Sequence, residues 1–208
     1  MAYAGLRYGI KEVADVKFYK IEAEKKVTVD DTTGIVSPNG ATVVLELDTL
    51  KVSNIEMTAE QAEARGGKGN APLIIWDYGR EINVTLEDAL MSLEMFNVLF
   101  GKEESDGNVT IGPNTFPGTY TVVGKTFARD TDGYDHIFTF FIPKAKIQSE
   151  NTITMEAEGD PTVFNMSLRV LRDGDTMMKL VLNETAMDTN TGIVDDSEWN
   201  GTTPVPGT

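Results

Sequence analysis

Apolar and polar residues alternate along most of this chain, and the alternation predicts a protein built mainly of β-strands. The clearest case is the segment REINVTLEDAL, in which Ile82, Val84 and Leu86 share one face and polar residues occupy the other. In total about eight to ten strands are expected, which favours an antiparallel β-sandwich or barrel. The main strand segments are 16–21, 42–54, 73–76, 80–90, 119–129, 137–147, 152–158, 163–172 and 177–182.

One segment departs from the alternation and predicts a single α-helix flanking the sheets. Leu93, Phe96 and Phe100 recur at helical spacing. Either Asp88 or Ser92 can cap the start of this helix, and the glycine that follows Phe100 suits its end.

Two strands carry irregularities in their patterns. The apolar positions of 42–54 change phase near Thr49, which predicts a β-bulge within one long strand. In 137–147 nearly every residue before Pro143 is apolar, so this strand is expected to be covered on both faces. Pro143 is expected to mark an edge or a bulge.

Residues 57–71 are polar and rich in glycine, and they predict a long loop. Such a sequence is unsuited to a helix or a buried strand. The segment is also too long for a simple hairpin turn, so the loop is expected to be functional or disordered. The apolar strand that follows is expected to place Trp76 in the core and to end at a corner formed by residues 77–79.

Length and composition predict one domain with two appendages. The 208 residues divide into an N-terminal arm (1–12), a β-sandwich domain (13–183) and an acidic, extended C-terminal tail (184–208). No stretch approaches the roughly 20 apolar residues of a membrane span, so no membrane insertion is expected. The chain has no cysteine, which excludes disulfides and thiolate metal sites. Its formal net charge of -15 either keeps the protein soluble or prevents DNA from sticking to it.

The residues that suggest chemistry do so weakly. His136 is the single histidine, and no nucleophile can be assigned to it. The acidic segment 130–135 resembles only part of a calcium loop, so a plain acidic turn is favoured. The glycines of 66–70 lack the ending of a phosphate-binding loop. We therefore predict no enzymatic activity, no catalytic residue, no cofactor and no metal.

Three phrases of the sequence are similar to one known family: GGKGNAPLIIWDYG (66–79), REINVTLEDAL (80–90) and the segment 142–166. With them the chain resembles the tail tube proteins, or major tail proteins, of long-tailed bacteriophages over most of 16–182. The resemblance implies that inner sheets join into a ring-shaped barrel on hexamerisation. Stacked rings would then form the tail tube of the virion, assembled in the host bacterial cytoplasm, through which the genome reaches the host.

The resemblance also implies partners and sites. Expected partners are further copies of the chain and the tape-measure, tail-tip and tail-terminator proteins, while DNA passes through without specific binding. The residues expected to face the lumen are Glu46, Asp48, Glu81, Asn83, Thr85 and Glu87. The residues expected to join stacked rings are Glu60, Glu63, Arg65, Gly66, Gly67, Lys68 and Gly69. The alternative is a stand-alone β-sandwich that binds a carbohydrate or another ligand, with exposed aromatic side chains around a cleft.

Overall fold

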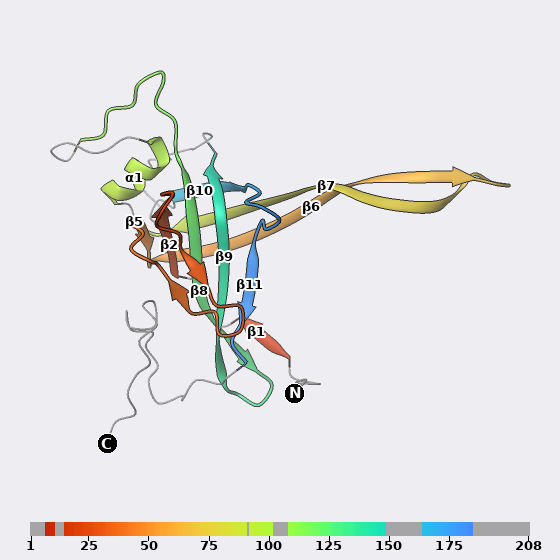
Figure 1. Cartoon of the computed structure of the whole chain (residues 1–208), viewed down its shortest axis with the longest axis horizontal. Coiled ribbons are helices and arrows are strands. Elements are labelled where there is room, and N and C mark those ends of the chain that lie inside the picture. The colour runs from red at the N-terminus through yellow and green to blue at the C-terminus, as the bar shows by residue number, and fades with distance from the viewer. Residues whose placement is uncertain (1–6, 11–14, 91, 102–107, 149–163, 185–208) are drawn as a thin grey trace, which may run out of the picture.

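A computed structural model describes residues 7–10, 15–90, 92–101, 108–148 and 164–184 (Figure 1). The predicted strand 152–158 and most of the predicted terminal appendages lie outside these residues. The elements are β1 (Tyr8–Ile10), β2 (Asp15–Lys20), β3 (Thr28–Val29), β4 (Val36–Ser37), β5 (Val43–Leu47), β6 (Leu50–Gly66), β7 (Ala71–Asp88), α1 (Leu93–Phe100), β8 (Thr119–Asp130), β9 (Asp135–Ile147), β10 (Phe164–Val170) and β11 (Lys179–Leu182).

Nine of these strands form one sheet, and each described pair of neighbouring strands in it is antiparallel. The order along the sheet is β5-β2-β8-β9-β10-β7-β6, while β1 pairs with β8 and β11 pairs with β9. Strands β3 and β4 form a separate two-stranded sheet. The predicted mainly β, antiparallel fold with one short helix is therefore confirmed.

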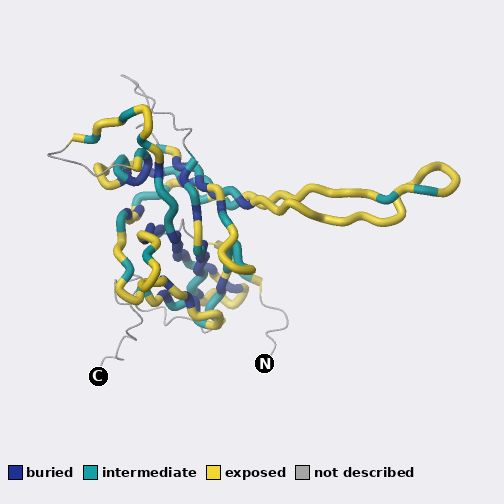
Figure 2. Tube along the Cα trace, turned by 45° about the horizontal axis from the view of Figure 1, so that its top comes forward, coloured by how far each residue is buried: buried dark blue, intermediate teal, exposed yellow. Residues whose placement is uncertain are grey.

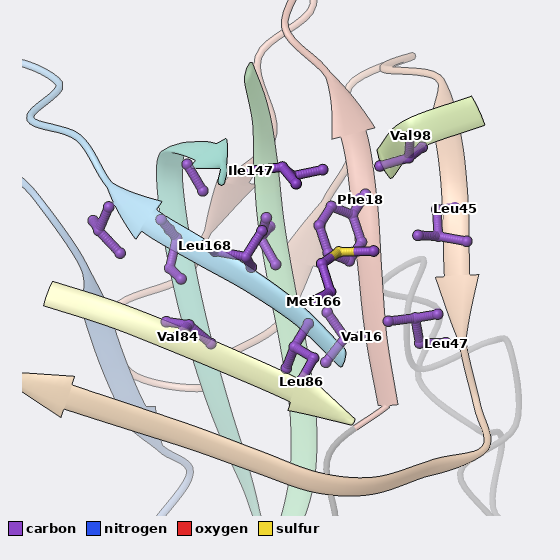
Figure 3. Close-up of a cluster of buried hydrophobic side chains, with 14 of the residues drawn as sticks. Val16, Phe18, Leu45, Leu47, Val84, Leu86, Val98, Ile147, Met166 and Leu168 are labelled. Carbon is purple, nitrogen blue, oxygen red and sulfur yellow. The ribbon is translucent and has the colours of Figure 1, made fainter. Parts of the chain in front are cut away.

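Apolar side chains lie on both faces of the central strands. Val16 and Phe18 of β2 belong to the larger core cluster, together with side chains of β5, β7, β9, β10 and α1 (Figure 3). The neighbouring Tyr19 points to the other face and belongs to a smaller cluster with residues of β3 and β4. Strand β9 is divided in the same way, because Phe140 lies in the larger cluster and Phe141 in the smaller one. The prediction that 137–147 is covered on both faces is confirmed.

The bulge expected at Pro143 is also present. The pairing of β8 with β9 shifts register between Tyr120 and Val122, which face Ala145 and Ile142. Two residues of β9 therefore oppose one residue of β8, which is the arrangement of a β-bulge. The hydroxyl of Thr121 donates a hydrogen bond of 2.9 Å to the carbonyl oxygen of Pro143, at the point where the proline has no N–H to offer.

Helix α1 forms where the sequence predicted it. Of the two candidate caps, Ser92 is used: its Oγ accepts a hydrogen bond of 3.1 Å from the backbone N–H of Met95. The helix ends at Gly101, which has a φ of 68° and donates its N–H to the carbonyl of Asn97 at 2.8 Å. Asp88 has another role, because its carboxylate accepts a hydrogen bond from the hydroxyl of Thr49.

The prediction of one continuous strand over 42–54 is wrong. Strand β5 ends at Leu47 and β6 begins at Leu50, because the chain passes from one margin of the sheet to the other at this point. Strand β5 pairs with β2, whereas β6 pairs with β7. The change of phase near Thr49 therefore marks this corner, and a register shift follows between Leu50 and Val52.

The prediction of a loop over 57–71 is also wrong. Strand β6 runs to Gly66 and β7 starts at Ala71, so that only residues 67–70 form the turn. The two strands make a long hairpin that projects from the body of the protein (Figures 1 and 2). The expected corner at 77–79 is a register shift, with Gly79 at a φ of 61°, inside a strand that continues. The outer part of this hairpin has no core beneath it and therefore needs no buried face. Its sequence accordingly lacks the strict alternation of apolar and polar residues that marks a strand with one buried face.

Candidate assembly surface

The outer part of the hairpin, residues 59–79, pairs with no described strand outside the hairpin, and we call it the hairpin arm. Its residues are exposed except for Ala64 and Gly66, which are half-buried (Figure 2). Strand β7 pairs with β10 only from Asn83 to Asp88, and among the described strands β6 pairs with β7 alone. An isolated two-stranded hairpin is at best marginally stable in water. The arm therefore has the geometry of an element that is completed by another molecule.

One face of the hairpin arm is apolar, and we call it the apolar arm face. It carries Ile74, Trp76 and Tyr78, each with an exposed fraction of 52%. In the register of the hairpin, Ala64 lies opposite Ile74 and Ala62 lies opposite Trp76, whereas Glu60 lies opposite Tyr78. The residues of β6 that face Ile74 and Trp76 are therefore small. The prediction that Trp76 lies in the core is wrong. Exposed apolar side chains gathered in this way are typical of an interaction surface.

The opposite face of the arm mixes apolar and polar side chains. Gln61 donates a hydrogen bond of 2.9 Å from Nε2 to Oδ1 of Asp77, across the two strands. Arg65 donates from Nε to Oε2 of Glu63 at 2.7 Å, along one strand. The hydrogen bond between Gln61 and Asp77 joins the two strands, while Leu73 and Ile75 on this face are exposed by 68% and 52%. Uncovered hydrophobic area therefore lies on both faces of the arm, and the aromatic side chains of Trp76 and Tyr78 distinguish the apolar arm face.

All the residues predicted to join stacked rings lie on the arm. Glu60, Glu63, Arg65 and Gly66 belong to β6, and Gly67, Lys68 and Gly69 belong to the turn. The apolar arm face was not predicted from the sequence. A signal for it was present, because Ala62 and Ala64 alternate with polar neighbours and so indicate a strand.

The two margins of the main sheet are open. Strand β5 pairs only with β2 and β6 only with β7 among the strands we describe, so each presents an unpaired backbone edge. Each edge also exposes a β-branched side chain, Val43 (43% exposed) on β5 and Val52 (40% exposed) on β6. Open edges are templates for pairing with another chain, and soluble proteins normally protect them.

The residues predicted to face the lumen lie near these two margins. On β7, Glu81, Asn83, Thr85 and Glu87 alternate with buried core residues and so point away from the larger cluster. Glu46 on β5 also points away from that cluster, and Asp48 directly follows β5. Four strands separate β5 from β7 in the sheet, so a single chain does not bring the two groups together.

Two of these acids have basic partners that the sequence did not reveal. Lys17 Nζ lies 2.7 Å from Oε1 of Glu46, and the guanidinium of Arg169 pairs with the carboxylate of Glu81. Both partners come from neighbouring strands that are remote in sequence. This face of the sheet is therefore less acidic than the spacing of its carboxylates suggests.

The single histidine belongs to a buried polar cluster that fixes a turn. His136 Nδ1 lies 2.9 Å from the carbonyl oxygen of Asn183, and its Nε2 lies 3.0 Å from Oδ2 of Asp130. The hydrogen bond with His136 is the main cause that lowers the pKa of Asp130, and backbone N–H groups of Tyr134 and Asp132 add to it. The oxygens of the Asp130 carboxylate thus accept hydrogen bonds from groups of the protein itself, which supports an acidic turn at 130–135 over a calcium loop. Within the described part of the chain, no three carboxylate or imidazole side chains are grouped as ligands for a metal ion.

Two further observations bear on the class of protein. In the part of the chain that is described, no helix has the length and hydropathy needed to cross a membrane. The exposed aromatics Trp76 and Tyr78 lie on β7 in the hairpin arm, and neither lines the cavity found between residues 21–28, β8 and β9, so they do not favour the carbohydrate-binding alternative. The fold and its surface define a β-sheet protein with open margins and an uncovered apolar arm.

Comparison with protein families agrees with this class. The model of the YomU/Tube protein family matches residues 8–107 and 96–181, and the chain belongs to this family. The name of the family indicates a phage tube-like structural protein and hence a component of the virion. A comparison with curated proteins gives no match. The resemblance to phage tail tube proteins is therefore supported at the level of a tube-like structural protein.

Proposed function

We propose that this protein forms hexameric rings that stack into the tail tube of a bacteriophage, the conduit for delivery of the genome. The observation that carries the proposal is the combination of two open sheet margins with an arm that has no partner among the described strands of its own chain. The function is structural and assigns no catalytic residue. Tape-measure, tail-tip and tail-terminator proteins are the expected further partners.

Ring closure follows from the two open margins. Strand β5 of one copy pairs with β6 of the next, which satisfies both edges by a head-to-tail contact. Head-to-tail contacts that close on themselves give a cyclic ring. If each copy in a hexamer contributes about four strands to the inner wall, the closed barrel has about 24 strands and encloses an open channel.

The same pairing explains how the two groups of lumen candidates would meet. Glu46 and Asp48 of one copy would lie on the same face as the polar side of β7 in the next copy, with β6 of that copy between them. Asp48 and Glu87 have no ion-pair partner in the described part of the chain, so these two acids would supply most of the negative charge. A negative lining repels phosphates and avoids the counterion release that drives non-specific DNA binding.

The charge of the lining can be tested by reversal. We expect the double variant Asp48→Lys/Glu87→Lys to form tubes but to eject DNA more slowly from the virion, because lysines would bind the passing phosphates. The measurement is the rate of DNA release at low and at moderate salt. Unchanged ejection at both salt concentrations would count against the lumen assignment.

Ring stacking is assigned to the hairpin arm. From the register shift at residues 58–60 to the turn, the arm extends about 25 Å at the usual rise per residue of a strand. We expect an arm of this length to reach beyond the ring of its own copy. Its apolar arm face would be covered by the neighbouring ring, and the polar residues of the turn would lie at the junction.

The decisive experiment removes the arm without exposing a strand. Glu60 lies opposite Tyr78, so deletion of 60–78 joins Ala59 to Gly79 and leaves a short hairpin loop that ends in the existing pair Thr58 and Glu81. We expect a folded protein that forms no tubes, as seen by negative-stain microscopy. Circular dichroism and thermal unfolding of the variant against the full chain provide the control for folding.

The outcome separates the two contacts. Isolated rings without tubes would assign the arm to stacking alone, as proposed. Long tubes made by the shortened chain would overturn the role of the arm. If the full chain shows neither rings nor tubes as its concentration rises, and remains a monomer, the proposed function itself is wrong.

A further inference from the structure

A second surface feature includes no residue of the arm and lies on the face of the sheet that carries the smaller core cluster. A cavity of about 280 Å³ opens between residues 21–28, strands β8 and β9, and the start of β11. Its apolar wall includes Val27 and Phe141, which belong to the smaller cluster, and Pro143. The cavity therefore combines a hydrophobic wall with an open mouth.

The rim of this cavity is basic. Its charged residues are Lys25, Lys26, Lys144, Lys179, Glu22 and Asp173. Two of the lysines are already neutralised, since Lys25 Nζ lies 3.0 Å from Glu22 and Lys179 Nζ lies 2.6 Å from Asp31.

The other two lysines, Lys26 and Lys144, are exposed and have no ion-pair partner in the described part of the chain. Two free ammonium groups beside an apolar wall are unusual on a chain whose formal net charge is -15. The chemistry that fits is an acidic group with an apolar side chain next to it, because the lysines attract the charge and the wall accepts the apolar part.

The sequence contains one segment with this chemistry. Residues 185–208 include four acids and no lysine or arginine. Within them, the segment IVDDSEW (193–199) places Asp195, Asp196 and Glu198 between two aliphatic residues and Trp199. Charge and apolar content are therefore complementary to those of the cavity.

The segment is also within reach of the cavity in its own chain. Strand β11 lines the cavity with its first residue, Lys179, and the described chain leaves the strand and ends at Glu184. The return path from Glu184 to Lys179 is five residues long and spans about 17 Å in an extended chain. The eleven residues from Glu184 to Asp195 can span up to about 36 Å. The linker is thus about twice as long as the return path requires.

We propose that residues 193–199 dock in this cavity of the same chain, with the paired aspartates against Lys26 and Lys144 and an apolar side chain against Phe141. The docked segment covers the apolar wall and neutralises the basic rim. This inference is independent of ring formation, because it is a contact within one copy.

The test follows cleavage of the full chain by chymotrypsin after Trp199, measured by mass spectrometry at concentrations where the protein is a monomer. When opening is fast, cleavage follows the fraction of molecules in which the segment is released. Each exposed ion pair changes such an equilibrium by a factor of roughly 1.5 to 5. Replacement of two attractive pairs by two repulsive ones in Lys26→Glu/Lys144→Glu should therefore accelerate cleavage about tenfold.

Two further variants make the result specific. Arg7→Glu/Lys51→Glu has the same change in charge at exposed residues outside the cavity, and it should be cleaved at the wild-type rate. Adding Asp195→Lys/Asp196→Lys to the cavity variant exchanges the charges of both partners and should restore slow cleavage. Restoration requires direct contact between the two sites, which a general effect of net charge does not reproduce.

The proposal is overturned if the cavity variant is cleaved as slowly as the control, or if the exchanged charges fail to restore protection. Protection that increases with protein concentration would also overturn it, because the segment would then dock on another copy. Protection that is constant over a fiftyfold range of concentration, and is weakened by salt, is the expected result.

Discussion

The apolar arm face allows a quantitative prediction for Trp76. This residue has an exposed fraction of 52%, and the residue opposite it in the hairpin is the small Ala62. A tryptophan can bury up to about 250 Å², so roughly 125 Å² is available for a contact with another copy. At about 25 cal/mol per Å², covering this area contributes about 3 kcal/mol to each contact. Trp76→Ala should therefore raise the critical concentration for tube formation about a hundredfold.

The assay is sedimentation of polymer from solutions of increasing protein concentration. Tyr134→Ala is the matched control, because Tyr134 is 53% exposed but lies in the turn between β8 and β9, outside the proposed contacts. Both variants should melt at about the wild-type temperature, since neither side chain is buried in the monomer. An unchanged critical concentration for Trp76→Ala would refute the role of the apolar arm face. An equal loss in both variants would show that the effect is not specific to the arm.

Two predictions concern the stability of the monomer. A Cβ at Gly124 would lie 2.1 Å from Cε1 of the buried Phe140 ring, so Gly124→Ala should lower the free energy of unfolding in urea by about 1–3 kcal/mol. Gly9→Ala is the control and should lower it far less, because a Cβ at Gly9 would have nothing within 4 Å. Equal urea midpoints for the two variants would contradict the close contact at Gly124. The hydrogen bond with His136 lowers the pKa of Asp130, so its ionised form stabilises the fold above the ordinary pKa of an aspartate, and this stability is lost as pH falls through the lowered pKa. Asp130→Asn should therefore lower the melting temperature at neutral pH and flatten its decline in acid, and parallel melting profiles from neutral pH to pH 2.5 would contradict this reasoning.

The sequence alone determined those elements whose causes are local. The strict alternation around Val84 predicted a strand with one buried face, and this strand lies in the larger core cluster. Helix α1 was predicted from its spacing and its caps, because Ser92 and Gly101 act on backbone groups only a few residues away. The bulge at Pro143 was equally local, since a proline has no N–H to offer to the pairing of strands.

The tertiary structure decided everything that depends on distant partners. The hairpin arm has no core under it, so it lacks the burial pattern that marks other strands, and its glycines resembled a loop. The pairing of Glu81 with Arg169 joins residues 88 positions apart, which no local spacing reveals. The cavity draws its lysines from two strands and a connecting segment. Local preferences act over a few residues, whereas the open margins, the exposed arm and the basic cavity result from which strands become neighbours.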